Sequence, residues 1–213
     1  IEFIMKKNKV TVDGPNLSVM KRTKQKVFIL ISANTGLYGD VVSRTFTAFM
    51  AETKRTQADL LIVGRMGKMF FEEAMPGTPF TYLDFPDNAI LTEDLKKIMM
   101  FISQYKKVVA FYPVFKNLLT QEVTASVISG AELVTGNTQG EVPKPYLFEP
   151  SLKEVVLFFE NEIFASLVEQ VFQESRLAKL VARMTLLNHA VTNIEGELER
   201  LKSKKQRLHH RTI

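Results

Sequence analysis

Short runs of apolar residues alternate with longer amphipathic segments along the first two thirds of the chain. The runs are rich in the β-branched and aromatic residues typical of strands. They predict strands at Val27–Ser32, Leu60–Gly64, Pro79–Phe85, Val108–Val114 and Val123–Ile128. Helices are expected between them at Val41–Thr53 and Thr92–Tyr105, the second with acidic residues in its first turn. Strands that alternate with helices indicate an α/β fold with a sheet that is parallel at least in part.

The pattern changes after residues 135–150, a stretch rich in glycine, proline and polar residues. Ser151, followed three residues later by Glu154, fits a capping box at the start of a helix. The rest of the sequence has no proline and a single glycine, Gly196. A helix of this length would measure roughly 90 Å, at about 1.5 Å per residue. Much of it is therefore expected to project from the α/β part.

Apolar residues in the second half of this helix recur at intervals of 3, 4, 3, 4, 3, 4 and 3 residues. This spacing places them in one stripe and is the signature of a coiled coil. The stripe, called the seam below, consists of Leu177, Leu180, Met184, Leu187, Val191, Ile194, Leu198 and Leu201. Upstream of it the spacing loosens and the apolar face widens, so that half is expected to lie on the α/β part.

A seam requires a partner helix, and this sequence contains no second long helix with heptads. Its first residues, IEFIMKK, look like the end of a helix, and an isoleucine at position 1 favours a partner helix that precedes the sequence. We therefore expect three parts. They are the end of an N-terminal coiled-coil helix with its connecting loop (1–23), a Rossmann-like α/β head (24–148) and a long C-terminal helix (149–213), which forms the shaft from about residue 175.

Composition limits the chemistry. The chain has 213 residues, no cysteine and three histidines, which excludes thiolate metal sites and disulfides within it and disfavours a histidine-rich metal centre. No apolar run approaches the roughly 20 residues of a transmembrane helix. The net charge of +5 includes a basic run without acids between Arg200 and Arg211. The run fits a solvated helix face or an acidic protein partner, and its lack of aromatic residues argues against nucleic acid.

The turn Ser32–Asp40, SANTGLYGD, follows a predicted buried strand, as many phosphate-binding loops do. A Walker loop requires G-x-x-x-x-G-K-[ST]. Here Gly36 and Gly39 are separated by only two residues, and the carboxylate of Asp40 would repel phosphate. The dinucleotide pattern G-x-G-x-x-G fails as well. We interpret both glycines as structural, permitting a tight turn and close helix packing.

A second turn, VGRMGK, also ends a predicted strand and carries Gly64 and Gly67. We interpret its glycines in the same structural way. Arg65 and Lys68 leave open an alternative in which this turn holds a small anion at the start of a helix.

Catalytic constellations are not apparent elsewhere. Glu72 and Glu73 are adjacent and would not converge on one helix face, and Asp84 and Asp87 are expected to form turns in a proline-flanked loop. His189 lies on the projecting helix without an acid three or four residues later. We therefore expect no catalytic, cofactor-binding or metal-binding residues.

Five sequence landmarks occur in a familiar order: ISANTGLYGD, LLIVGRMGKMFF, YPVFKN, YLFEPS and VARMTLLNHAVTN. Together with the α/β pattern and the seam, they make the chain resemble the gamma subunit of F-type ATP synthases. The family reads I-S-S-D-R-G-L-C-G-G at the first landmark, V-V-G-R-K-G at the second, Y-N-K-F at the third, Y-x-x-E-P-S at the fourth and A-A-R-M-x-A-M-x-x-A-T-D-N at the fifth. The resemblance covers the chain from about residue 27 to its end.

The resemblance implies a non-catalytic, central-stalk rotor subunit. In that family the C-terminal helix pairs with an N-terminal helix as an antiparallel coiled coil, which passes through a ring of alpha and beta subunits. The head stands on an epsilon-type subunit and the membrane rotor ring. The expected location is therefore peripheral, on the cytoplasmic face of the bacterial plasma membrane rather than on the mitochondrial matrix side. No cofactor is implied for this subunit.

Departures from the family pattern indicate a divergent member, from a specialised F-type-like rotary ATPase. Tyr38 stands where cysteine is common and Asp40 where the second glycine stands. Arg207 aligns with a family arginine, whereas His209 and His210 stand where Arg-Gln usually contacts the catalytic ring. The resemblance thus implies ring contacts at Arg207, His209 and His210. Two other interpretations are a non-rotary coiled-coil adaptor with an α/β head and a small-anion-binding α/β domain.

Overall fold

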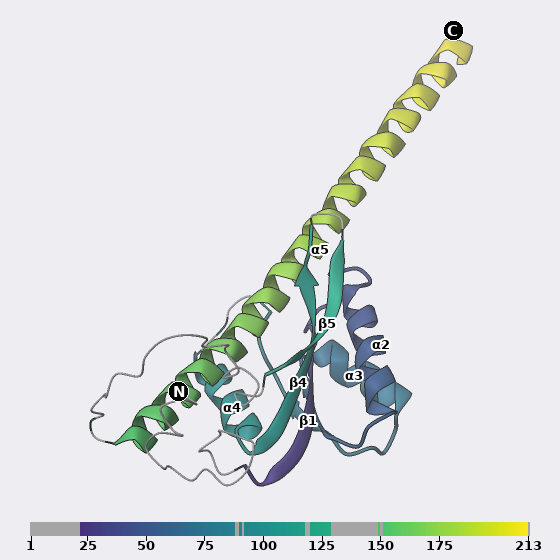
Figure 1. The fold of residues 1–213 in the computed structure, drawn as a ribbon. Helices are drawn as coiled ribbons and strands as arrows, with labels where there is room; N and C mark the ends of the chain where they lie inside the picture. Colours follow the sequence, from purple (N-terminus) through teal and green to yellow (C-terminus); the bar gives the residue numbers. More distant parts are fainter. Residues whose placement is uncertain are drawn as a thin grey trace.

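The computed structural model describes residues 22–87, 90, 92–117, 120–128, 149 and 151–212 of the chain. A small α/β head holds one end of a long helix whose other end projects far beyond it (Figure 1). In chain order the elements are β1 (Lys24–Ile31), α2 (Val41–Thr53), β2 (Asp59–Val63), α3 (Arg65–Ala74), β3 (Thr81–Leu83), α4 (Thr92–Ile102), β4 (Tyr105–Phe115), β5 (Gln121–Val127) and α5 (Leu152–Thr212).

The five strands form one sheet in the order β3-β2-β1-β4-β5. β1 lies at its centre and pairs in parallel with β2 and with β4, and β2 pairs in parallel with β3. The edge strand β5 is antiparallel to β4. This mixed α/β sheet is the fold class that the alternation of apolar runs and helices predicts.

Helices cover both faces of the sheet. Figure 1 shows α2 and α3 on one side, and α4 with the first half of α5 on the other. Successive residues of β1 point to opposite faces, as the period of a strand requires. Val27, Ile29 and Ile31 join the core under α4 and α5, whereas Phe28 and Leu30 join the core under α2 and α3. Because β1 is buried on both faces, it reads as a continuous apolar run.

Element boundaries differ from the sequence expectations at several places. The strand predicted at Pro79–Phe85 is only Thr81–Leu83, and the helix predicted to reach Tyr105 ends at Ile102 because Tyr105 begins β4. Helix α3 was not among the predicted elements. The predicted N-terminal helix end and most of the glycine- and proline-rich loop lie outside the described residues.

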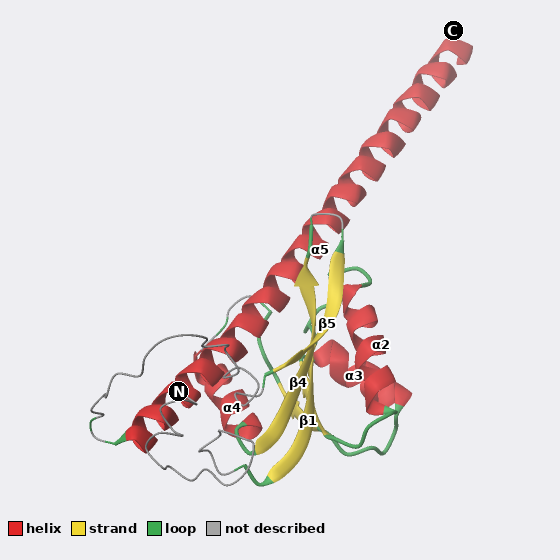
Figure 2. Cartoon of the chain, in the orientation of Figure 1, coloured by secondary structure: helices red, strands yellow, loops and turns green. Residues whose placement is uncertain are grey.

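The long helix α5 begins where the capping pattern predicts. The Glu154 amide donates a hydrogen bond of 3.2 Å to Ser151 Oγ, one half of a capping box. The helix continues for 61 residues without a break (Figure 2). At about 1.5 Å per residue it is about 90 Å long. Among the described residues, no helix combines the length and the apolar character needed to cross a membrane.

Candidate functional site

The first half of α5 binds the head through one buried face. Its apolar side chains pack against β4 and α4, and the ring of Phe172 lies 4.7 Å from that of Phe85, measured between centroids. The buried apolar residues of this face are Phe164, Val168, Val171, Phe172 and Ala178. Steps of three, four or seven residues between them keep them on one side of the helix. The expectation that this half lies on the α/β part is therefore met.

The seam on the second half of α5 is uncovered. Each of its eight side chains is between 46% and 64% exposed, and no part of the chain that the structure describes packs on the projecting portion. Monomeric proteins seldom expose an apolar surface of this extent, and such surfaces mark interaction sites. The strict alternation of three- and four-residue steps suits one kind of partner, another helix.

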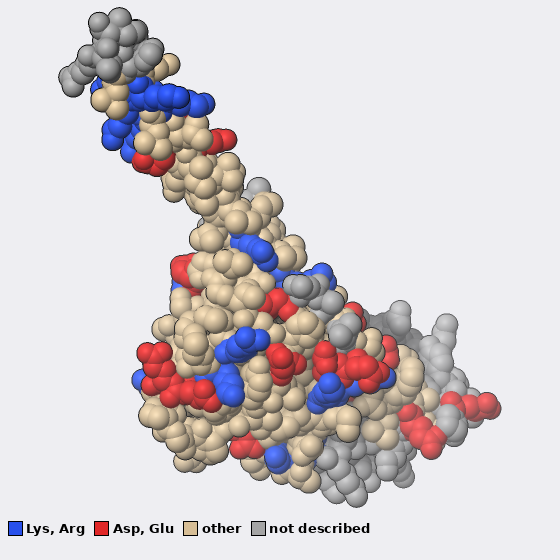
Figure 3. Space-filling view, turned by 180° about the vertical axis from the view of Figure 1, so that it is seen from behind, with Lys and Arg blue, Asp and Glu red and all other residues tan. Residues whose placement is uncertain are grey.

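Basic side chains gather near the tip of α5, as the space-filling view shows (Figure 3). Arg200 forms an ion pair of 2.8 Å with Glu197 one turn earlier. The exposed cations that follow are Lys202, Lys204, Lys205 and Arg207. The side chains of His209 and His210, two of the predicted ring contacts, lie outside the described part of the chain.

The carboxyl edge of the sheet is where open α/β sheets bind ligands. In this chain its own side chains fill that edge. Asn34, just after β1, donates its backbone amide to Asp87 Oδ2 (2.9 Å) and its side-chain amide to Asp84 Oδ1 (2.9 Å). Its side-chain oxygen accepts the Arg65 amide at the start of α3 (2.8 Å). Asp84 and Asp87 thus hold the edge together through contacts with a residue 50 and 53 positions away in the sequence, rather than through the local turns that the sequence analysis expects.

Close contacts or positive φ explain three of the four glycines in the two turns. A Cβ on Gly67 would lie 2.7 Å from the Cβ of Ser32, and one on Gly64 would lie 2.9 Å from the Ala33 nitrogen. Gly64 and Gly39 also adopt positive φ, at 97° and 62°. Gly36 differs, since its φ is not positive and a Cβ there would meet nothing within 4 Å. Gly64 and Gly67 are therefore required for the close packing of α3 on the end of β1.

The second turn has little capacity for an anion. The amides of Arg65 and Met66, which would face a phosphate at the start of α3, already donate to Asn34 Oδ1 (2.8 Å) and to the Ala33 carbonyl (2.8 Å). Lys68 lies 3.8 Å from Glu72. These contacts weigh against the small-anion alternative.

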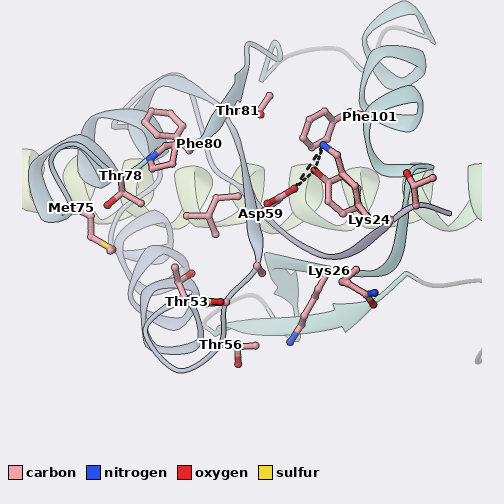
Figure 4. Close-up of a pocket in the computed structure, with 17 residues that line it drawn as sticks. Lys24, Lys26, Thr53, Thr56, Asp59, Met75, Thr78, Phe80, Thr81 and Phe101 are labelled. Atoms are coloured by element: carbon pink, nitrogen blue, oxygen red, sulfur yellow. Dashed lines mark hydrogen bonds and ion pairs between the residues drawn. The ribbon is translucent and has the colours of Figure 1, made fainter.

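A broad hollow lies at the opposite edge, where β1, β2 and β4 begin (Figure 4). Its polar groups are paired with one another. Tyr105 donates to Asp59 Oδ2 (2.7 Å), and Lys24 Nζ lies 3.2 Å from the Tyr105 hydroxyl and 3.8 Å from Asp59. Burial and the Asp59 carboxylate both raise the pKa of Tyr105, so the hydroxyl stays a donor at neutral pH. This triad joins three strands and presents no nucleophile with a base.

Histidine and carboxylate side chains do not assemble into a metal site in the described part of the chain, where no group of three or more metal-ligating residues occurs. His189 is exposed on the projecting helix.

One buried residue was missed by sequence reasoning. Lys179 lies on the head-facing side of α5, and its ammonium donates to the Ser32 carbonyl (2.9 Å) and lies 3.6 Å from Asp87 Oδ1. Burial lowers the pKa of Lys179, and Asp87 opposes that shift. The available signal was its position seven residues after Phe172 in the buried stripe, where a charge requires a partner.

Comparison with known proteins shows which family has this architecture. A family model described as ATP synthase matches residues 3–213. The ATP synthase gamma chain of Pelotomaculum thermopropionicum is 28% identical over 204 residues, covering 89% of this chain and 69% of the relative. The gamma chain of Geobacter sp. (strain M21) is 26% identical over 196 residues, covering 85% and 66%. The chain thus spans about two thirds of the length of these relatives.

Solved structures share the fold. The rotor of the Euglena gracilis mitochondrial ATP synthase matches with a TM-score of 0.63 at 13% identity, covering 97% of this chain and 86% of that one. The central stalk and c-ring structure of the Tetrahymena thermophila enzyme matches with a TM-score of 0.58 at 19% identity, covering 89% and 93%. A head that holds one long helix, a family model that matches nearly the whole sequence and gamma-chain relatives agree: this chain belongs to the ATP synthase family, on the gamma-chain branch.

Proposed function

We propose that the chain is a central-stalk rotor subunit of an F-type or F-type-like ATPase and couples rotation of its shaft to conformational change in a catalytic alpha/beta ring. The observation that carries the proposal is the seam: eight apolar residues, exposed along a helix whose other half is fixed to a folded head. A non-rotary adaptor could carry a seam too, but the gamma-chain relatives favour the rotor.

The geometry suits the transmission of torque. A continuous helix is a stiff rod only when its exposed apolar stripe is covered, since an isolated helix in water is marginally stable. An N-terminal helix of the same protein, packed antiparallel on the seam, would supply that cover. The head then serves as the base of the two-stranded coiled coil. The asymmetric tip of the coiled coil sets the conformation of the catalytic subunit that the tip faces. In this proposal the ATP chemistry belongs to the alpha and beta subunits.

Partners are proposed at both ends. The exposed cations near the tip, Lys202 to Arg207, suit acidic surfaces on the inner side of the alpha/beta ring. The head would rest on an epsilon-type subunit and on a membrane rotor ring, which makes the chain a peripheral subunit. We place it on the cytoplasmic face of a bacterial plasma membrane.

Co-purification of the full-length protein tests this function. An affinity tag placed on the head is expected to recover alpha and beta subunits together with ATPase activity. A matched preparation with Leu187→Asp in the seam should recover much less of both, because the shaft cannot pair. Recovery of the wild-type protein alone, or with partners lacking ATPase activity, would contradict the rotor and favour the adaptor.

A further inference from the structure

Lys179 and Asp87 are charged groups enclosed between α5 and the head. Their side chains are only 10% and 6% exposed, respectively. Transfer of two charges out of water costs several kcal/mol per ion unless geometry and further hydrogen bonds compensate. The pair therefore has a strong preference for one arrangement, unlike the apolar contacts around it.

The compensation comes from a connected set of hydrogen bonds. The Lys179 ammonium also donates to the Ser32 carbonyl (2.9 Å) at the end of β1. Asp87 also accepts the Asn34 backbone amide (2.9 Å), and Asn34 in turn accepts the Arg65 amide (2.8 Å). One cation from α5 is thereby linked to the loop after β3, the turn after β1 and the start of α3. These three segments close the carboxyl edge of the sheet.

Lys179 lies near the place where α5 leaves the head. Ala178 and Lys179 are the last buried residues in the described part of the helix. Ala182 still packs partly on the head, and the residues from 186 to 208 are all exposed. Near the other end of the head, Glu160 forms a second enclosed ion pair with Arg22, of 3.1 Å. Beyond Lys179 the helix extends for about 50 Å, at about 1.5 Å per residue. A torque on the tip acts on the head through this exit point.

Apolar packing alone would hold the helix less specifically. Ridges of aliphatic side chains can repack after a small shift along or around a helix, because dispersion contacts are individually weak and non-directional. A buried ammonium cannot shift without losing its acceptors, which leaves an uncompensated charge.

We propose that the Lys179–Asp87 pair is a lock that fixes the axial and rotational position of α5 on the head, so that head and shaft turn as one body. The first half of this proposal, that the pair fixes α5 on the head, concerns the chain itself. The second half, that head and shaft turn as one body, rests on the proposed rotor function. Lys179 and Asp87 are positioning residues, since they act through the helix they hold.

The decisive variant is the double substitution Lys179→Met with Asp87→Asn. It removes both charges together, and replacing a buried pair by uncharged groups is often neutral for stability. The asparagine oxygen still accepts the Asn34 amide. Lys54→Met, at the exposed end of α2 and away from the tip, is the matched control for loss of a lysine. Val168→Ala, a cavity on the same buried face, is the control for lost stability without loss of the pair.

Two measurements are made on each variant. Hydrogen–deuterium exchange of the full-length protein reports opening of α5 over residues 175–186. In the double variant we expect it to rise about tenfold relative to a Val168→Ala protein of equal or lower stability, the factor that loss of one charge-assisted hydrogen bond gives. In the assembled complex we expect the proton transport per ATP hydrolysed to fall in the double variant, and we expect Lys54→Met to leave both the exchange and the transport ratio unchanged.

Each outcome decides one half of the proposal. Unchanged exchange over residues 175–186 in the double variant would overturn the lock. Increased exchange with an unchanged transport ratio would show that the pair holds the helix but that coupling does not depend on it, which overturns the second half. If even the unsubstituted protein forms no complex with catalytic subunits, the rotor function fails, while the exchange measurement still decides the lock.

Discussion

Each half of α5 carries an apolar stripe, and one stripe is buried whereas the other is exposed. In the half that lies on the head, the stripe from Phe164 to Ala178 is buried against β4 and α4. In the projecting half, the stripe from Leu177 to Leu201 is exposed along its whole length. The loose spacing of the first stripe fits the wide face that a sheet offers, whereas the strict spacing of the second fits the narrow groove of one helix.

One helix therefore carries two kinds of interface, a wide face that packs on the head and a narrow seam that suits another helix. Around Leu177 to Lys179, successive residues belong to different surfaces: Leu177 to the seam, Ala178 and Lys179 to the head. The overlap joins the shaft to the head within a single turn. A perturbation of either stripe should therefore have its own signature. Three of the four substitutions below separate the two stripes and the third in order tests the head alone, from the largest expected effect to the smallest.

Leu187→Asp should produce the largest change, loss of coupled ATPase activity. A carboxylate placed in a coiled-coil core must be buried without a partner, which costs several kcal/mol. Proton transport and ATP hydrolysis by the assembled complex measure the effect. Asn188→Asp places the same charge on the exposed neighbouring position off the seam and should behave as wild type. Equal coupling in the two variants would remove the seam assignment.

Phe172→Ala should destabilise the head by about 3–5 kcal/mol, the usual cost of truncating a buried phenylalanine. Phe172 is 4% exposed, and its ring packs against that of Phe85 at an interplanar angle of 39°. Phe158→Ala, at a phenylalanine of the same helix that is 63% exposed, should change stability little. Denaturant unfolding of both proteins checks the difference. A similar loss of unfolding free energy in the two variants would contradict the burial of Phe172 and the exposure of Phe158.

Gly67→Ala should cost about 1–3 kcal/mol, because its methyl group would press on Ser32 and force α3 away from β1. Gly36→Ala meets open space and should be close to neutral. Thermal unfolding compares the two. Addition of inorganic phosphate should not shift the melting temperature of the wild type or of either variant, since the amides of Arg65 and Met66 are already engaged. A phosphate-induced rise confined to the wild type would revive the anion site.

Tyr112→Phe should give the smallest loss, about 1 kcal/mol for one hydrogen bond. The Tyr112 hydroxyl donates to Glu174 Oε2 (3.0 Å) and joins β4 to α5. Burial, followed by that hydrogen bond, raises the pKa of Tyr112 from 10.0 to about 12.

The pH dependence follows from that pKa. The stabilisation from protonated Tyr112 is fully present below the unfolded pKa of 10.0 and is lost as the pH rises towards about 12. The difference in unfolding free energy between wild type and Tyr112→Phe should therefore shrink across this range. A difference that stays constant from about pH 9 to about pH 12 would contradict the assignment.

Local signals predicted much of the architecture. Val27 to Ile31 read as a buried strand because both faces of β1 are covered, and Ser151 with Glu154 marked the start of α5 correctly. The heptad spacing predicted a stripe with no cover within the chain, and the described residues leave it exposed. Its helical partner remains a prediction.

Other features required contacts that no local pattern contains. Helix α3 was overlooked because Gly67, a poor helix former, lies in its first turn. Only the close approach of Gly67 to Ser32 in the fold explains why a glycine stands there. Gly36 shares the sequence context of Gly39 but not its positive φ. Lys179 lies 92 residues from Asp87 in the sequence, so only the fold reveals that the lysine is paired.

Observation of rotation tests the central claim most directly. The sequence has no cysteine, so Lys54→Cys at the exposed end of α2 gives one attachment point on the head for a bead. With the catalytic ring of the assembled complex fixed to a surface, ATP should drive the bead in continuous turns of one direction. ATP hydrolysis at an undiminished rate with a bead that only fluctuates would contradict the rotor.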